Sequence, residues 1–216
     1  MIKKQFALPL EPAGRAGRIV IGPANEAALA ALQAPGNWPF HTAILFGPAR
    51  SGKSLLAGWF AAQGLGEAVD DAPSMDEDAL FHRWNRAQAS GTPLLLTAAL
   101  QQGPAPEGVR LLGGCWPVRL PDLGSRLGAA LILKIGEPDD TMLAELILAH
   151  AEARSLPLAE EAAFYLASRM ERHHLDAERV VAVIDRLSLE RKAPPAMGIC
   201  RAALEELYGA SQPRLP

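Results

Sequence analysis

Residues 47–54 have the types and the spacing that a polyphosphate-binding loop requires. They are Gly-Pro-Ala-Arg-Ser-Gly-Lys-Ser, which satisfies the pattern G-x-x-x-x-G-K-[ST] in full. Glycines let successive backbone N–H groups turn inward around phosphate oxygens, and the N-terminus of a following helix adds its dipole. Lys53 would reach the β- and γ-phosphates, and the hydroxyl of Ser54 would ligate Mg²⁺. The residues predicted to contact a nucleotide in this stretch are Gly47, Pro48, Ala49, Arg50, Ser51, Gly52, Lys53, Ser54 and Leu55.

A phosphate-binding loop of this kind also needs a carboxylate at the end of a neighbouring strand to hold the magnesium. Asp70 and Asp71 end a short β-like run that begins at residue 67, and they are the pair best placed for this role. Asp70 is therefore predicted to bind the metal together with Ser54, and Asp71 is the candidate catalytic residue that orients water. The alternative is a turn or a helix cap ahead of Pro73, and the sequence leaves both interpretations open.

The elements around the loop predict a parallel α/β sheet. The apolar run 43–46 is typical of a buried parallel strand and leads directly into the loop, and apolar residues then recur at helical spacing up to residue 63. Two further apolar strands are predicted at 94–98 and 130–135, and helices at 26–33 and 75–89 alternate with the strands.

Two details of this sheet can be predicted from connection lengths. Only residues 64–66 separate the helix after the loop from the strand at 67, so the sheet is expected to be one strand short. A loop is predicted at 101–108, and 115–120, with a short helix through 123–127, is expected to help complete the sheet.

After residue 136 the pattern becomes entirely helical. Segments at about 138–154, 159–171, 176–190 and 195–208 carry apolar residues at helical period, which predicts a small helical bundle. The predicted organisation is an N-terminal arm at 1–18, a nucleotide-binding domain at 19–136 and a helical lid domain at 137–216. The lid is expected to close against the nucleotide.

The composition excludes several classes of protein. Of 216 residues, 24 are acidic and 21 basic, and this net charge of −3 argues against the broad cationic surface of a protein that binds DNA directly. The two cysteines, Cys115 and Cys200, fit a reducing compartment without disulfides. No apolar run approaches the roughly 20 residues of a membrane span, so we expect a cytoplasmic protein.

The order of these motifs resembles a known family. The segments at 19–25, 47–54, 69–71 and 120–127 are Ile-Val-Ile-Gly-Pro-Ala-Asn, the phosphate loop, Val-Asp-Asp and Leu-Pro-Asp-Leu-Gly-Ser-Arg-Leu. They follow one another as in the AAA+ module of the bacterial replication initiator DnaA. The resemblance extends to about residue 208 and is closest to Hda, a shorter homologue that keeps this module and lacks the initiator's DNA-binding domain.

The resemblance implies a fold, a cofactor and two partners. The fold is an AAA+ three-layer parallel α/β sheet followed by a helical lid, and the cofactor is ADP or ATP with Mg²⁺. Ile21 and Gly22 would lie against the adenine. Arg126 matches the arginine finger, a cation offered to a nucleotide on a neighbouring subunit, which here would be the initiator. The arm at 5–10 resembles the hexapeptide that docks on the DNA polymerase sliding clamp, and the partner-binding residues would be Gln5, Phe6, Leu8, Pro9 and Leu10.

Departures from the family favour a protein that holds a nucleotide and rarely cleaves it. Where the family has a polar sensor residue, the strand ends Thr97-Ala98-Ala99, and the arginine of the third lid helix aligns with Glu178, with Arg179 one position away. Alternatives remain open at this stage. The chain could be an autonomous AAA+ NTPase of the helicase-loader type, a P-loop small-molecule kinase or a non-hydrolysing interaction module, and it could self-associate.

Two local alternatives also remain. The arm could be a strand packed on its own domain, and Arg126 could form a surface salt bridge. His173 and His174 are adjacent, point to different faces of a helix and have no cysteine or carboxylate partner in metal-ligand spacing, so they do not predict a metal site.

Overall fold

The computed structural model describes residues 18–100 and 110–209. Contacts divide the chain into two compact units, which we call the P-loop unit and the helical unit. Among the described residues, the P-loop unit comprises 25–100 and 110–136, and the helical unit comprises 18–24 and 137–209. The two are described separately below.

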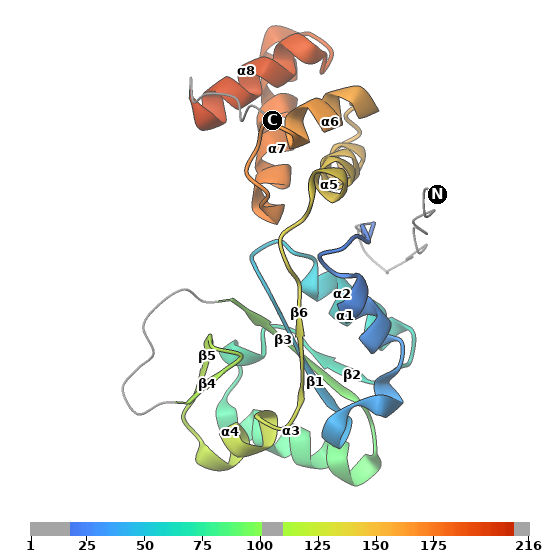
Figure 1. Cartoon of the computed structure of the whole chain (residues 1–216), viewed down its shortest axis with the longest axis vertical. Helices are drawn as coiled ribbons and strands as arrows, with labels where there is room; N and C mark the ends of the chain where they lie inside the picture. The colour runs from blue at the N-terminus through green and yellow to red at the C-terminus, as the bar shows by residue number, and fades with distance from the viewer. Residues whose placement is uncertain (1–17, 101–109, 210–216) are drawn as a thin grey trace. The chain divides into compact units, whose positions relative to one another are not determined.

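The P-loop unit is built on a parallel sheet of four strands. β1 (Thr42–Gly47), β2 (Glu67–Val69), β3 (Leu94–Ala99) and β6 (Leu131–Lys134) lie in the order β2-β3-β1-β6 (Figure 1). All three pairings are parallel. Every residue of β1 is buried, as expected of a central strand covered on both faces. The predicted α/β class and the short connection before β2 are therefore confirmed.

Helices cover both faces of this sheet. One face packs against α3 (Glu77–Ser90) and α4 (Pro121–Leu127), with Ile44, Phe46 and Leu96 in the shared core. α2 (Lys53–Ala62) contacts β1, β2 and β3, and Figure 1 shows it with α1 (Glu26–Leu32) away from α3 and α4. Short 3-10 helices occupy Pro35–Asn37, Pro39–His41 and Ala72–Ser74.

One expected strand does not join the sheet. β5 (Trp116–Val118) pairs antiparallel with β4 (Arg110–Leu112) in a separate hairpin, so the prediction that 115–120 helps to complete the main sheet was wrong. Gly113 and Gly114 have φ of +59° and +82°, a conformation that glycine adopts readily and that lets the chain reverse between the two short strands. Pro117 lacks an N–H, which also suits a hairpin better than a central strand.

The edge strand β2 carries a small ion-pair cluster. Glu67 Oε2 lies 3.2 Å from Nε of Arg83 and 3.2 Å from Nη2 of Arg86, both on α3. Hydrogen bonds from these two arginines outweigh the effect of partial burial and lower the pKa of Glu67. The backbone N–H of Glu67 donates to the carbonyl of Pro93, 2.8 Å away, and this bond fixes the start of β2 against β3.

The helical unit contains α5 (Asp140–Ala153), α6 (Glu160–Ala167), α7 (His174–Arg191) and α8 (Met197–Tyr208) around one apolar core. α6 ends four residues earlier than predicted, and α7 begins two residues earlier. Residues 19–24, which the sequence assigned to the nucleotide-binding domain, group by contacts with the helices. Gly22 explains this, because a Cβ there would lie 2.9 Å from Sδ of Met142 on α5.

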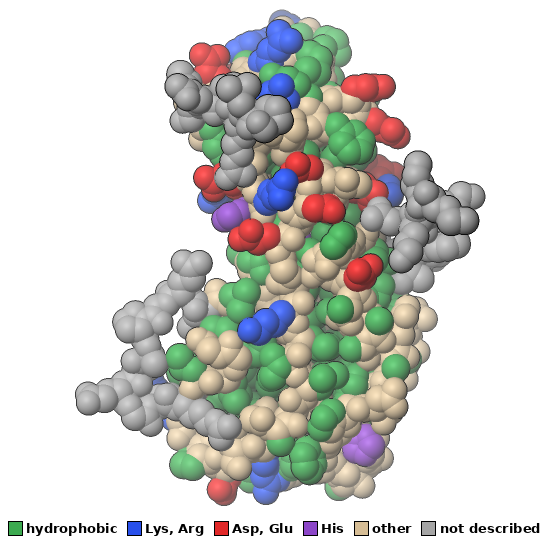
Figure 2. Space-filling view, in the orientation of Figure 1, with side chains coloured by type: hydrophobic (Ala, Val, Ile, Leu, Met, Phe, Trp, Pro, Cys, Tyr) green, Lys and Arg blue, Asp and Glu red, His purple; other side chains and the backbone are tan. Residues whose placement is uncertain are grey.

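Charged side chains of both signs are interspersed over the visible face of the helical unit (Figure 2). On the visible face of the P-loop unit, hydrophobic and uncharged atoms predominate. Neither face shown carries the broad basic area of a non-specific nucleic-acid binder.

Gly66→Ala and Gly58→Ala form a matched pair that tests the tight start of β2. A Cβ at Gly66 would lie 2.2 Å from the carbonyl oxygen of Pro93, whereas a Cβ at Gly58, inside α2, would meet nothing within 4 Å. Alanine inside a helix is about 0.5–1 kcal/mol more favourable than glycine, and forced overpacking costs about 1–3 kcal/mol. Urea denaturation should therefore show Gly66→Ala destabilised and Gly58→Ala unchanged or stabilised. Equal stability of the two variants would contradict the close approach.

Candidate functional site

The connection between β1 and α2 has the backbone of a phosphate-binding loop. Gly52, just before α2, has φ of +86°, and Arg50 has φ of +62°. Gly47 leaves no room for a side chain, because a Cβ there would lie 2.6 Å from Oγ of Ser51 and 3.1 Å from Cβ of Ile135. Both glycines of the motif are therefore required by the local geometry.

The residues between and after these glycines differ in exposure. Ser51 is buried beneath the loop, and its hydroxyl has no hydrogen-bond partner in the described chain. Arg50 is exposed in the loop, Ser54 and Leu55 are exposed at the start of α2, and Pro48 and Ala49 form the outer turn. The N-terminus of α2 is thus open to an anion on the side where the motif predicts phosphate.

Lys53 is folded back onto its own loop. Its Nζ donates to the carbonyl oxygens of Gly47, at 2.9 Å, and of Pro48, at 2.7 Å. Burial lowers the pKa of Lys53, and the negative charges of Asp70 and Asp71 act in the opposite direction. The charges of both carboxylates therefore act on the ammonium of Lys53. Binding of a polyphosphate would exchange the two carbonyl contacts for phosphate oxygens.

Thr97 connects the two aspartates to the sheet. β3 lies between β1 and β2, so Asp70 is two strands away from the phosphate loop and Thr97 lies on the strand between them. The Thr97 hydroxyl donates to Oδ1 of Asp70 at 2.6 Å, and the backbone N–H of Asp71 donates to the same hydroxyl at 2.9 Å. Thr97 is only 1% exposed. The sequence identified this residue but undervalued it, because hydrogen bonds across strands cannot be seen in the sequence.

The two aspartates also form the turn that was the alternative interpretation. Asp71 has φ of +50° and precedes the 3-10 helix Ala72–Ser74, and the Ser74 hydroxyl donates to its carbonyl. The turn and the metal-binding interpretation are compatible, because Asp70 and Asp71 keep exposed carboxylates. Ser54 and Asp70 offer hard oxygen donors of the kind that Mg²⁺ prefers, so the donor set fits the predicted ion.

Arg126 lies at the other end of the sheet. β6 is parallel to β1 and begins at Leu131, so the end of α4 is at the amino edge, whereas the phosphate loop is at the carboxyl edge of β1. The Arg126 guanidinium donates through Nη1 to Oδ1 of Asn85. It also stacks on the rings of Phe81 and Trp84, with 4.6 Å from Cζ to each centroid. We call these three α3 residues the arginine cage.

In the described chain, Arg126 contacts the arginine cage and not the carboxylate that the salt-bridge alternative requires. Phe81, Trp84 and Asn85 are spaced i, i+3, i+4 and share one face of α3. They hold the guanidinium through two ring faces and one amide rather than through a carboxylate. The sequence missed the cage because contacts between α3 and α4 depend on tertiary packing.

The other residues named from the sequence lie in the helical unit or outside the described residues. Ile21 and Gly22 belong to the helical unit by contacts. Arg179 is exposed on α7 and pairs with Asp176, 3.4 Å away, and Glu178 lies beside it on the same helix. Gln5, Phe6, Leu8, Pro9 and Leu10 lie outside the described residues.

The comparisons with known proteins concern the fold. No protein-family model and no curated protein matches the chain. Domain III of the Thermotoga maritima replication initiation protein DnaA is similar in structure, with a TM-score of 0.65 and 16% identity over 87% of this chain and 94% of that one. The Thermotoga maritima RuvB Holliday junction branch migration motor follows, with a TM-score of 0.59 and 21% identity over 87% of this chain and 70% of its own.

A replication initiator DnaA bound to AMPPCP and single-stranded DNA is a further similar structure. Its TM-score is 0.54, at 16% identity over 81% of this chain and 66% of that one. DnaA and RuvB share the AAA+ P-loop fold, so the predicted fold is confirmed. Within the described residues, none of the helices is both long enough and apolar enough to span a bilayer.

Replacing Thr97 by valine tests the link between the strands. Valine keeps the shape but removes the hydroxyl, so the N–H of Asp71 and the carboxylate of Asp70 lose a partner. A hydrogen bond to a charged group contributes about 1.5–3 kcal/mol to stability. We expect chemical denaturation to show that loss in Thr97→Val and a much smaller one in Thr97→Ser, which retains the hydroxyl. A valine variant as stable as the wild type would contradict the assigned bonds.

Proposed function

We propose that the chain is an adenine-nucleotide-binding AAA+ regulator of chromosomal DNA replication. In this proposal it docks on the DNA polymerase sliding clamp, acts in the cytoplasm and stimulates hydrolysis of ATP bound to the initiator DnaA. ADP or ATP with Mg²⁺ occupies the loop at 47–55, with Asp70 and Ser54 at the metal. Support comes from the loop geometry, from the Lys53–Asp70–Thr97 arrangement and from the resemblance to the Hda branch of the DnaA family.

The observation that carries the proposal is the position of Arg126. It lies at the sheet edge opposite the phosphate loop, so its guanidinium cannot serve a nucleotide bound to its own P-loop unit. A cation placed there is available to a nucleotide on another molecule, where it would stabilise charge that develops on the transferred phosphoryl group. A head-to-tail contact between unlike surfaces is the geometry this requires.

The arginine cage supports that role energetically. Arginine has several rotatable bonds, and fixing such a side chain costs about 0.5–1.5 kcal/mol when it binds. Phe81, Trp84 and Asn85 already restrict the Arg126 side chain in the isolated chain. Part of the conformational entropy of the Arg126 side chain is therefore already lost before a partner binds. Its guanidinium is half-buried and remains accessible.

Weak hydrolysis of the chain's own nucleotide is part of the proposal. β3 ends at Ala99, whose methyl side chain cannot donate a hydrogen bond, and the Thr97 hydroxyl is engaged with Asp70 and Asp71. Arg179 is paired with Asp176 on its own helix. Asp71 would orient water, but few groups on the described chain remain to stabilise a transition state in cis. The bound nucleotide would then act mainly as a conformational ligand.

Clamp docking rests on the arm at 5–10. Gln-Phe-Ala-Leu-Pro-Leu has a leading amide and spaced apolar side chains, the chemistry that an extended peptide uses to fill a hydrophobic pocket. The net charge of −3 is consistent with recruitment to DNA through a protein rather than by direct contact. Self-association through the AAA+ surfaces is compatible with the same scheme.

An autonomous AAA+ NTPase is the second candidate, and the similarity to the RuvB motor favours it. Turnover by the purified chain alone, lost in Lys53→Ala, would select this alternative. A non-hydrolysing interaction module would instead bind nucleotide and leave initiator-bound ATP unchanged.

Nucleotide binding can be tested by calorimetry with ADP and ATP in the presence of Mg²⁺. Lys53→Ala removes a charge-assisted bond worth about 1.5–3 kcal/mol, so affinity should fall about 10- to 100-fold. Lys192→Ala, which removes an exposed lysine at the C-terminal end of α7 in the helical unit, is the matched control and should bind as the wild type does. Absence of binding by the wild-type chain would refute the proposal at its first step.

The trans role can be tested by hydrolysis of initiator-bound ATP in the presence of DNA-loaded clamp. Arginine fingers contribute about 10³–10⁵ in rate, so Arg126→Ala should abolish stimulation, whereas Arg119→Ala, an exposed neighbouring arginine, should not. Gln5→Ala should reduce stimulation by weakening attachment to the clamp. Equal rates for Arg126→Ala and the wild type would remove the proposed mechanism and leave nucleotide binding untouched.

A further inference from the structure

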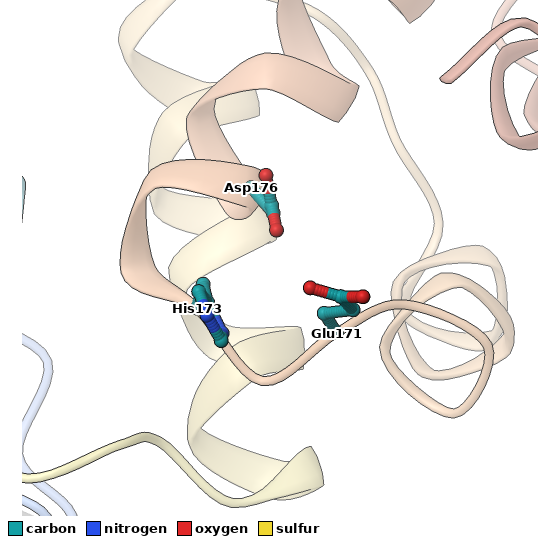
Figure 3. A group of neighbouring side chains, drawn as sticks. All are labelled: Glu171, His173 and Asp176. Atoms are coloured by element: carbon teal, nitrogen blue, oxygen red, sulfur yellow. The ribbon is translucent and has the colours of Figure 1, made fainter. Parts of the chain in front are cut away.

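Three potential metal ligands meet just before and within the first turn of α7. Glu171, His173 and Asp176 each offer one ligand atom, and these atoms all lie within 4.8 Å of one another. Figure 3 shows the three side chains grouped around the turn that leads into α7. This cluster belongs entirely to the helical unit and shares no residue with the phosphate loop.

The backbone holds the three residues together locally. The N–H of His173 donates to the carbonyl of Glu171 at 2.8 Å, and the N–H of Asp176 donates to the carbonyl of His173 at 3.1 Å. His173 has extended φ and ψ of −116° and 134° and is the N-cap residue of α7. Because the ligands span only six residues of a hydrogen-bonded turn, little chain entropy is lost when a ligand brings them together.

His174, the adjacent histidine, does not take part. It is 2% exposed, whereas His173 is exposed, so the two rings have different surroundings, as the sequence predicts for neighbouring helical positions. The sequence-based rejection of a metal site considered the two histidines as a pair and found no carboxylate partner. The structure supplies two carboxylates to His173 alone.

The charges around the cluster leave it electronegative. The Asp176 side chain is 12% exposed, and its ion pair with Arg179 is long, at 3.4 Å, to a side chain that is 60% exposed. Arg172 is directed elsewhere, because its Nε lies 2.8 Å from Oδ1 of Asp140. On α8, burial together with the negative charges of Asp176 and Glu171 raises the pKa of Tyr208 to about 12.

We propose that Glu171, His173 and Asp176 form a site for a divalent transition-metal ion, with Zn²⁺ as the best match. One imidazole nitrogen and two carboxylate oxygens are a donor set that zinc accepts, with water completing the coordination. Mg²⁺ and Ca²⁺ prefer oxygen-only ligands. The helix dipole explains a carboxylate at Asp176, in the first turn of α7, but not the placement of Glu171 and His173, which precede the helix.

The bound ion would connect the segment after α6 to the first turn of α7. A ligand that binds the folded state and not the unfolded state raises stability by mass action. The expected effect is therefore a zinc-dependent increase in thermal stability. This effect does not depend on nucleotide, the clamp or the initiator.

The test uses the full chain without an affinity tag, stripped of metal with EDTA and titrated with ZnCl₂. We expect saturation at one equivalent by calorimetry and an upward shift of the melting temperature. Glu171→Gln and His173→Ala should each weaken binding at least tenfold, while Glu160→Gln and His150→Ala, which alter side chains on α6 and α5, should bind as the wild type does. MgCl₂ and CaCl₂ at the same concentrations should produce no shift.

Several outcomes would overturn the site. They are the absence of saturable binding at one equivalent, zinc binding that survives both cluster variants, and an equal response to MgCl₂. Circular dichroism of the metal-free variants controls for folding. Glu171 and His173 are exposed, so their replacement should leave the metal-free melting temperature close to that of the wild type.

Discussion

The parallel direction of β1, β3, β2 and β6 is the constraint on which the rest of the site depends. Parallel strands present their carboxyl ends at one edge, so the phosphate loop after β1, Thr97 on β3 and Asp70 after β2 converge there without any long connection. The same rule sends α4, which precedes β6, to the opposite edge. One strand direction thus separates the edge that carries the phosphate loop from the edge that carries Arg126.

Electrostatics at the carboxyl edge is balanced within the chain. The ammonium of Lys53 is partly desolvated and donates hydrogen bonds to two carbonyl oxygens. The negative charges of Asp70 and Asp71 also act on it, and the buried hydroxyl of Thr97 donates to the Asp70 carboxylate. A polyphosphate bound at the loop would meet a cation whose position is already restrained. At the other edge, the cage on α3 restrains Arg126 in a comparable way with rings and an amide. Both cations of the proposed mechanism are therefore restrained by contacts within the chain.

The sequence predicted the fold well where local patterns decide it, and less well where tertiary contacts do. The strand, loop and helix at 42–62 follow from apolar runs and glycines that act over a few residues. The hairpin of β4 and β5 was missed because strands of three residues have no readable period, and their pairing depends on the positive φ of two glycines. Asn85 and Glu171 were missed for another reason. In the sequence, an amide or a carboxylate resembles any solvated side chain until its neighbours in space are known.

The shortened sheet leaves β2 as an edge strand, with one side of its backbone unpaired among the described residues. Such an edge is a risk for aggregation in the cell. Open strand edges invite pairing with foreign chains, which leads to aggregation. Here the exposed edge is three residues long and begins at a glutamate joined to two arginines. An incoming strand would find few backbone amides with which to pair. It would also have to displace the ion pairs of Glu67 with Arg83 and Arg86. The loss of a strand is therefore compatible with a chain that remains dispersed.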